Sequence, residues 1–166
     1  MRKLCCVTAI ATAAAAVILP ATSAGAASQT VQGTGDIEKM VAKNGDSALK
    51  VSLFGLGAPC DAKYMKVTID WGTKAGYAID NGCYSGGTWA HSLVYLADRS
   101  NAEGGKLIEC PKLRFSWDED AEAHRAKVPR SCIPKAGDKL RVRAEGVNFT
   151  SVTGGEAGPT KRLRRG

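Results

Sequence analysis

The sequence predicts an all-β protein made of two facing antiparallel sheets, and three observations lead to this prediction. Apolar and polar residues alternate with a period of two through much of the chain after residue 36. Clusters of Gly, Asn and Asp separate the alternating stretches at fairly regular spacing. Apart from the apolar N-terminus, no window has the periodicity of an amphipathic helix. These patterns are typical of half-buried antiparallel strands.

The clearest alternating stretches are 49–54, 64–71, 112–117 and 138–145. In the first stretch, Leu49, Val51 and Leu53 share one face and are expected to point into the core. Turns are expected at 44–46, 80–82, 86–87, 103–105 and 136–138. Eight or nine short strands arranged in this way predict a two-sheet β-sandwich of the immunoglobulin-like kind, with a barrel as the alternative.

The N-terminal residues have the composition of an export signal. Arg2 and Lys3 precede an apolar run over residues 4–19, and the small residues 24–26 follow it. This order is typical of a secretory signal peptide, with cleavage expected after residue 26 or 27. The run is shorter than the roughly 20 residues that span a bilayer, so no stable membrane insertion is expected. The mature protein is therefore predicted to be secreted and extracellular.

The 166-residue chain is predicted to hold one domain after the signal. Its expected parts are a signal peptide (1–26), a flexible N-terminus (27–35), a β-sandwich domain (36–150) and a disordered basic tail (151–166).

The net charge of +7 is concentrated near the C-terminus. Without Arg2 and Lys3, the 23 basic residues become 21, against 16 acidic ones, and four of the 21 lie in the segment 161–166. The rest of the mature chain is nearly neutral, whereas nucleic-acid binding needs a basic face on the folded body. We therefore expect no nucleic-acid partner and a solvated tail, with weak attraction to anionic cell-wall polymer or lipid headgroups as the alternative.

The cysteines predict disulfides. Two of the six belong to the predicted signal, and the mature chain keeps Cys60, Cys83, Cys110 and Cys132. An even number in an oxidising compartment favours two disulfides. The wide spacing lacks the close pairs of a structural zinc site, so neither a metal nor another cofactor is predicted.

The pairing follows from the register of one expected hairpin. If the strands around residues 113 and 128 pair, Trp117 lies opposite His124, because their inward faces must match. The same register brings Cys110 within one position of Cys132, at a separation that a disulfide accepts. The predicted disulfides are Cys110–Cys132 and Cys60–Cys83.

No catalytic set is recognisable. His91 and His124 are the only histidines, and no serine lies in the G-x-S-x-G pattern of a nucleophile elbow. His124 is expected to be an ordinary packing partner of Trp117. The acidic segment 118–122 is expected to be a solvated turn, with a calcium site as the alternative. The sequence therefore predicts that the protein is not an enzyme.

One group of rings suggests a binding surface. Alternation places Trp89, His91 and Tyr95 on one strand face, and Tyr84 precedes them across a glycine-rich link. Aromatic faces offer apolar area to the C–H groups of sugars. These four residues are the predicted ligand-binding site of a non-enzymatic domain for cell-wall polymer or polysaccharide. The alternative is that this face belongs to the core.

The order of motifs resembles that of exported β-sandwich proteins of unknown function from actinobacteria. The likeness is carried by "LKVSLFG", "VTIDWG", "LIECPKLRFSW" and "KVPRSCIPKAGDKLRVRAE", and it covers most of residues 36–145. It departs from that pattern in the additional pair Cys60 and Cys83. The resemblance implies the fold and an exported location, and it implies no catalytic residue.

A second function is predicted as an alternative. The bond between Arg130 and Ser131 lies beside Cys132, between Pro129 and Pro134. A disulfide beside a reactive bond would hold its loop rigid and lower the ordering cost of binding. The alternative is therefore a secreted serine-protease inhibitor that offers Arg130 to a trypsin-like enzyme. The sequence leaves the oligomeric state open.

Overall fold

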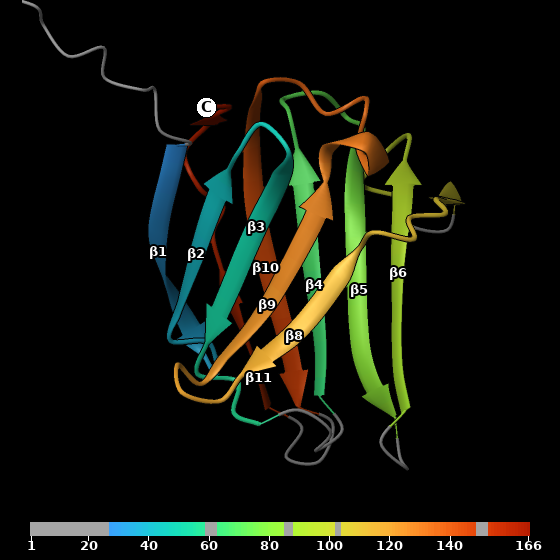
Figure 1. The fold of residues 1–166 in the computed structure, drawn as a ribbon. Helices are drawn as coiled ribbons and strands as arrows, with labels where there is room; N and C mark the ends of the chain where they lie inside the picture. Colours follow the sequence, from blue (N-terminus) through green and yellow to red (C-terminus); the bar gives the residue numbers. More distant parts are fainter. Residues whose placement is uncertain (1–26, 59–62, 85–87, 102–103, 149–152) are drawn as a thin grey trace, which may run out of the picture.

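The computed structural model describes residues 27–58, 63–84, 88–101, 104–148 and 153–166. These residues contain twelve β-strands and a short 3-10 helix, η2 (Figure 1). The elements are β1 (Ala27–Gly35), β2 (Lys39–Asn44), β3 (Ala48–Phe54), β4 (Lys63–Asp70), β5 (Gly76–Tyr84), β6 (Thr88–Leu96), β7 (Lys106–Leu107), β8 (Arg114–Asp118), β9 (Ala123–Pro129), η2 (Arg130–Cys132), β10 (Lys139–Asn148), β11 (Thr153–Ala157) and β12 (Leu163–Arg164). The predicted signal peptide lies outside the described residues.

The strands form one antiparallel path in the order β7-β6-β5-β4-β10-β11-β1-β2-β3-β9-β8, and β12 pairs with β10. Strand β1 joins the two halves, because its first part pairs with β2 and its last part, Gly33–Gly35, pairs with β11. The path curls so that β1, β2, β3, β9 and β8 form a layer in front of β10, β4, β5 and β6 (Figure 1). The prediction of an all-β antiparallel fold is confirmed. The finer prediction of a two-sheet sandwich stays a prediction.

The core lies between the two layers and consists of the inward members of the alternating strands. Val51 and Leu53 from β3 are almost completely buried, as are Val67 from β4 and Val142 from β10. The intervening residues of β3, such as Lys50, face outward. Alternation therefore predicted the core face of these strands correctly. The described strands exceed the predicted eight or nine, partly because β7 and β12 have only two residues each.

The β8–β9 hairpin has the predicted register. Trp117 pairs with His124, and Phe115 pairs with Ala126. A disulfide joins Cys110 to Cys132 at the open end of this hairpin, with a Cα–Cα distance of 5.7 Å. The predicted Cys110–Cys132 bridge is confirmed. Cys60 lies outside the described residues, so its pairing with Cys83 stays a prediction.

Both ends of the described chain differ from the predictions. Residues 27–35 were expected to be flexible, yet they form β1. The segment 151–166 was expected to be disordered, yet its described part contains β11 and β12. The glycines of this segment allow close packing: a Cβ added at Gly155 would lie 2.1 Å from the carbonyl oxygen of Thr34. The tail is also anchored by Leu163, which is completely buried.

A further correction concerns residues 80–82, which were expected to form a turn. They lie inside β5, where Asp80 pairs with Ser92 and Asn81 pairs with His91. The Asp-Asn-Gly composition indicated a turn, but pairing on both sides, with β4 and with β6, holds this segment extended. Within the described ranges, no helix has the length and apolar character needed to cross a membrane.

Candidate functional site

A cleft of about 440 Å³ lies between β5 and β6 of one layer and β8 and β9 of the other. It forms because β8 is one end of the strand path, while β6 lies near the other end. The curl brings these strands to facing layers (Figure 1). The residues that line the cleft include the aromatic side chains of His91, Phe115, Trp117 and His124, together with Asn81. The cleft therefore combines apolar ring surfaces with a few polar groups, as ligand pockets generally do.

The four rings form two pairs. The rings of His91 and Phe115 contact each other across the two layers, with centroids 5.5 Å apart. The rings of Trp117 and His124 lie side by side on the hairpin, with centroids 4.7 Å apart. His91 is exposed, Phe115 and Trp117 are half-buried, and His124 is buried. The ring surfaces are therefore partly open to solvent at the mouth of the cleft.

His124 is held in place by the backbone. Its Nε2 lies 2.9 Å from the carbonyl oxygen of Gly57. A carbonyl oxygen only accepts hydrogen bonds, so Nε2 carries the proton in this contact. His124 is thus a fixed part of the wall beside Trp117, which agrees with the packing role that the sequence predicted for it.

Asn81 provides a buried polar group in the cleft. The residue is 3% exposed, and no described residue donates a hydrogen bond to its side-chain oxygen, Oδ1. Buried polar groups are nearly always paired, because leaving one unpaired costs about 1–3 kcal/mol. Asn81 also lines the cleft, so its side chain is the candidate polar partner for a molecule bound there.

The predicted ring site is only partly brought together. His91 lines the cleft, but Tyr95 packs against Tyr77 with ring centroids 5.4 Å apart, and Lys135 Nζ lies 4.0 Å above the Tyr95 ring. Its neighbour two residues earlier, Leu93, is buried in the core. Leu93 is thus a core residue, and Tyr95 is half-buried against the core. The side chains of Tyr84 and Trp89 lie outside the described part of the structure.

The sequence missed three of the residues that line the cleft. Asn81 was expected in a turn, although Tyr77, Ile79 and Cys83 lie at every second position on the same side as Asn81 and could have indicated a strand. Phe115 and Trp117 were assigned correctly to an inward face. Their alternation does not reveal that β8 lies at one end of the strand path. At this end, the inward face borders an open cleft instead of the closed core.

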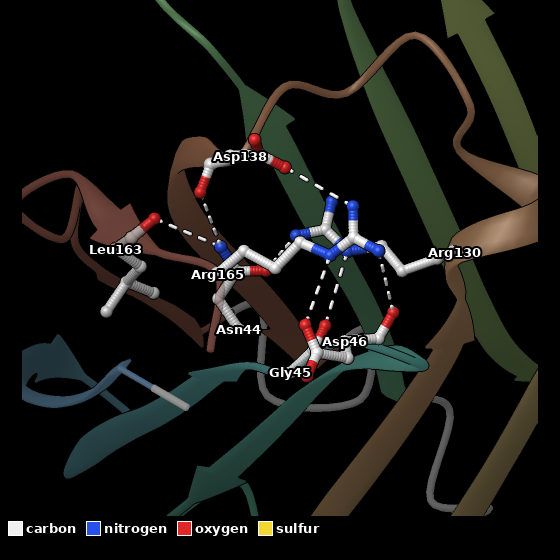
Figure 2. Close-up of polar contacts among 7 residues, drawn as sticks. All are labelled: Asn44, Gly45, Asp46, Arg130, Asp138, Leu163 and Arg165. Atoms are coloured by element: carbon white, nitrogen blue, oxygen red, sulfur yellow. Dashed lines mark hydrogen bonds and ion pairs between the residues drawn. The ribbon is translucent and has the colours of Figure 1, made fainter. Parts of the chain in front are cut away.

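Arg130 is the residue that the alternative function would present to a protease, and its side chain is bound by groups of the protein itself. Its guanidinium donates hydrogen bonds to Asn44 Oδ1 and to the carbonyl oxygen of Gly45 (Figure 2). Residues 130–132 form η2, and the Arg130 backbone N–H donates to Ser47 O. Burial and the nearby positive charge of Arg165 lower the pKa of Arg130.

The C-terminal residues complete the same cluster. Arg165 forms ion pairs with Asp46 and Asp138 at 3.4 and 3.3 Å, and Figure 2 shows its guanidinium next to that of Arg130. Asn44 Nδ2 donates to the carbonyl oxygens of Leu163 and Asp138. These contacts attach the end of the chain to the β2–β3 turn, which is a structural role.

The acidic turn after β8 forms local contacts. Asp118 forms an ion pair with Arg125 and accepts a hydrogen bond from the backbone N–H of Ala121. In the described part of the chain, no group of three or more His, Cys, Asp and Glu residues is placed to hold a metal ion.

The comparisons with known proteins give no family for this chain. No protein-family model matches it, and no curated protein sequence matches it significantly. What can be proposed about its function therefore depends on the fold and on the cleft.

Proposed function

We propose that the protein is a secreted, non-enzymatic binding domain that holds a segment of cell-wall polymer or other extracellular polysaccharide in the ring-lined cleft. One observation carries the proposal: Asn81, whose buried oxygen has no partner among the described residues, lines the same cleft as the rings of His91, Phe115 and Trp117. Its volume of about 440 Å³ falls within the range of roughly 300–1,000 Å³ that ligand pockets commonly have.

The chemistry of a sugar matches both kinds of group in this cleft. The C–H faces of a pyranose ring pack on aromatic rings, which here belong to Phe115 and Trp117. A sugar hydroxyl is a hydrogen-bond donor, and Asn81 Oδ1 accepts one hydrogen bond without displacing an internal partner. A purely apolar ligand would leave this oxygen unpaired, so a ligand with hydroxyl groups is favoured.

The proposal includes an exported location and an immunoglobulin-like two-sheet sandwich. The predicted signal peptide supports export, and the Cys110–Cys132 disulfide is typical of proteins in oxidising compartments. The two facing layers joined through β1 support the sandwich. Membership among the exported actinobacterial β-sandwich proteins that the motifs resemble is part of the same proposal.

Retention of the mature protein on purified peptidoglycan, cellulose and chitin tests the proposed function. We expect retention on at least one of these polymers, and Trp117→Ala should reduce the bound fraction at least tenfold, because it removes a stacking surface. Trp71→Ala is the matched control, since Trp71 is a half-buried Trp that packs on Tyr77 outside the cleft. The proposal fails if the parent protein binds none of the polymers, or if both variants lose binding equally while remaining folded.

The alternative of a protease inhibitor receives less support. An inhibitor must present its specificity side chain to the protease, whereas the Arg130 guanidinium donates to Asn44 and Gly45. Titration of trypsin with the protein checks this alternative, because stoichiometric inhibition would favour it over the binding domain.

A further inference from the structure

Four basic residues form a row across the outer face of the front layer. Lys43 of β2 pairs with Lys50 of β3, Lys50 pairs with Lys127 of β9, and Lys127 pairs with Arg114 of β8. All four side chains are exposed. We call this set, Lys43, Lys50, Lys127 and Arg114, the cationic row.

The surface beside the cationic row is also basic. Arg125 is paired in register with Ser52 on one side and Ser116 on the other, immediately next to the row. A hollow of about 250 Å³ on this face is lined by three members of the row together with Arg125 and these serines. The row is therefore the edge of a basic depression and not a set of scattered charges.

The cationic row is not neutralised within the described residues. None of its three lysines forms an ion pair there, and the Arg114 guanidinium donates only to the carbonyl oxygens of Pro111 and Leu113. Two acidic residues beside this layer are paired with other cations: Asp118 with Arg125, and Glu38 with Lys39. Like charges directly opposite each other on neighbouring strands destabilise a sheet. The fold thus keeps a repulsive arrangement that an anionic ligand would relieve.

The geometry indicates an extended ligand. Neighbouring strands lie about 4.8 Å apart, so the row presents four positive charges along about 14 Å. The lysine side chains are long and flexible, which allows them to follow a chain whose charges are spaced somewhat differently. A polymer with a negative charge in every repeat matches such a row better than a single small anion does.

Two observations argue against nucleic acid and against a membrane surface as the partner of the row. Single-stranded nucleic acids are usually held by stacking on exposed rings. Among the described outward positions of β2, β3, β9 and β8, the one ring is Phe54, half-buried with Lys39 Nζ 4.7 Å above it. Membrane-surface segments insert apolar side chains. The large exposed hydrophobic residue of the described chain, Leu107, lies on β7 instead.

We propose that the cationic row binds a linear inorganic polyphosphate chain. The lysines of this second site point away from the ring-lined cleft, whereas Arg114, Ser116 and Arg125 line both hollows. The proposal rests on the row of like charges and does not use the function proposed for the cleft. The nearly neutral charge of the predicted mature body gave no sign of a basic face. Sheet pairing gathers cations from four strands on one side, and this segregation is invisible in the net charge.

Binding of long-chain inorganic polyphosphate to the mature protein, measured by calorimetry at 50 and 200 mM NaCl, tests the proposal. The test variant carries Lys43→Gln, Lys50→Gln and Lys127→Gln. The matched control carries Lys139→Gln, Arg141→Gln and Lys161→Gln, which removes the same charge from exposed positions outside the row. We expect the parent protein to bind more weakly at the higher salt concentration, and the row variant to lose at least tenfold in affinity, while the control changes about twofold.

Three outcomes would overturn this proposal. The parent protein could fail to bind polyphosphate at 50 mM NaCl, or the two triple variants could lose affinity equally, which would assign the effect to net charge. Tighter binding to oligothymidylate than to polyphosphate would indicate that the ligand is a nucleic acid. Tighter binding to phosphatidylglycerol vesicles would indicate that it is a membrane. Because the row variant removes repulsion, it should fold normally, and its retention on glycan should equal that of the parent.

Discussion

The hairpin of β8 and β9 has two faces that differ in their side chains and in which polar or charged groups have no partner among the described residues. Its inner face carries Phe115, Trp117 and His124 into a cleft that Asn81 also lines, and the Asn81 oxygen has no partner in the described part of the chain. Its outer face carries Arg114 and Lys127 in a row of like charges. Among the described residues, no donor is paired with Asn81 Oδ1 at the inner face, and no acidic side chain forms an ion pair with the cationic row at the outer face. Each face therefore has a defect that a different ligand would correct.

This difference shows how one edge hairpin can serve two surfaces. Alternation sends successive side chains to opposite sides of the sheet, so five residues of β8 contribute both rings and a cation. In the centre of the sheet the inward side chains are covered by the other layer, as Val51 and Leu53 are. At β8 the other layer no longer covers the inward side chains completely, and the inward rings line the cleft. Position in the sheet, more than residue type, separates a ring in the closed core from a ring that lines the cleft.

The largest expected effect comes from breaking the element that the two faces share. Replacing Cys110 and Cys132 together by Ala should lower the free energy of unfolding by about 3 kcal/mol, because the disulfide restricts the unfolded chain. Since this bridge fixes the end of the hairpin, both glycan retention and polyphosphate binding should weaken. Urea unfolding followed by tryptophan fluorescence gives the stability. An unchanged midpoint, or loss of one binding activity alone, would contradict the shared role of the hairpin.

A smaller effect, opposite in sign, is expected at the inner face. Asn81→Leu should raise the free energy of unfolding by about 1 kcal/mol, because it removes a buried polar oxygen that has no described partner. The same change should abolish retention on glycan and leave polyphosphate binding intact. Thermal unfolding and the retention assay measure the two effects. A destabilised variant would indicate that the oxygen is satisfied in the free protein, which would weaken the argument for a ligand hydroxyl.

The smallest effect is expected at the outer face. Lys50→Gln removes a charge that lies between two others, Lys43 and Lys127, and should raise the free energy of unfolding by a few tenths of a kcal/mol at low salt. The gain should disappear near 1 M NaCl, where charge interactions are screened within about 3 Å. Lys161→Gln, outside the row, serves as the control. Equal gains for both variants at low salt would show that net charge, not the row, determines the effect.

The amino-acid sequence determined the local properties of the chain. The period-two pattern predicted the strands around Val51, Val67 and Val142 and their buried faces, because alternation is a property of each strand alone. The register of the β8–β9 hairpin and the Cys110–Cys132 bridge were also predictable, since matching two inward faces across a short turn leaves one arrangement.

The tertiary structure decided everything that depends on how distant strands meet. Gly155 and Leu163 looked like parts of a flexible tail, and pairing with β1 and β10 made them parts of the sheet. Asn81 looked like a turn residue until pairing on both sides placed it in β5. The cleft and the cationic row each combine residues from strands far apart in sequence. Their existence depends on strand order, which the local pattern of a single strand does not encode.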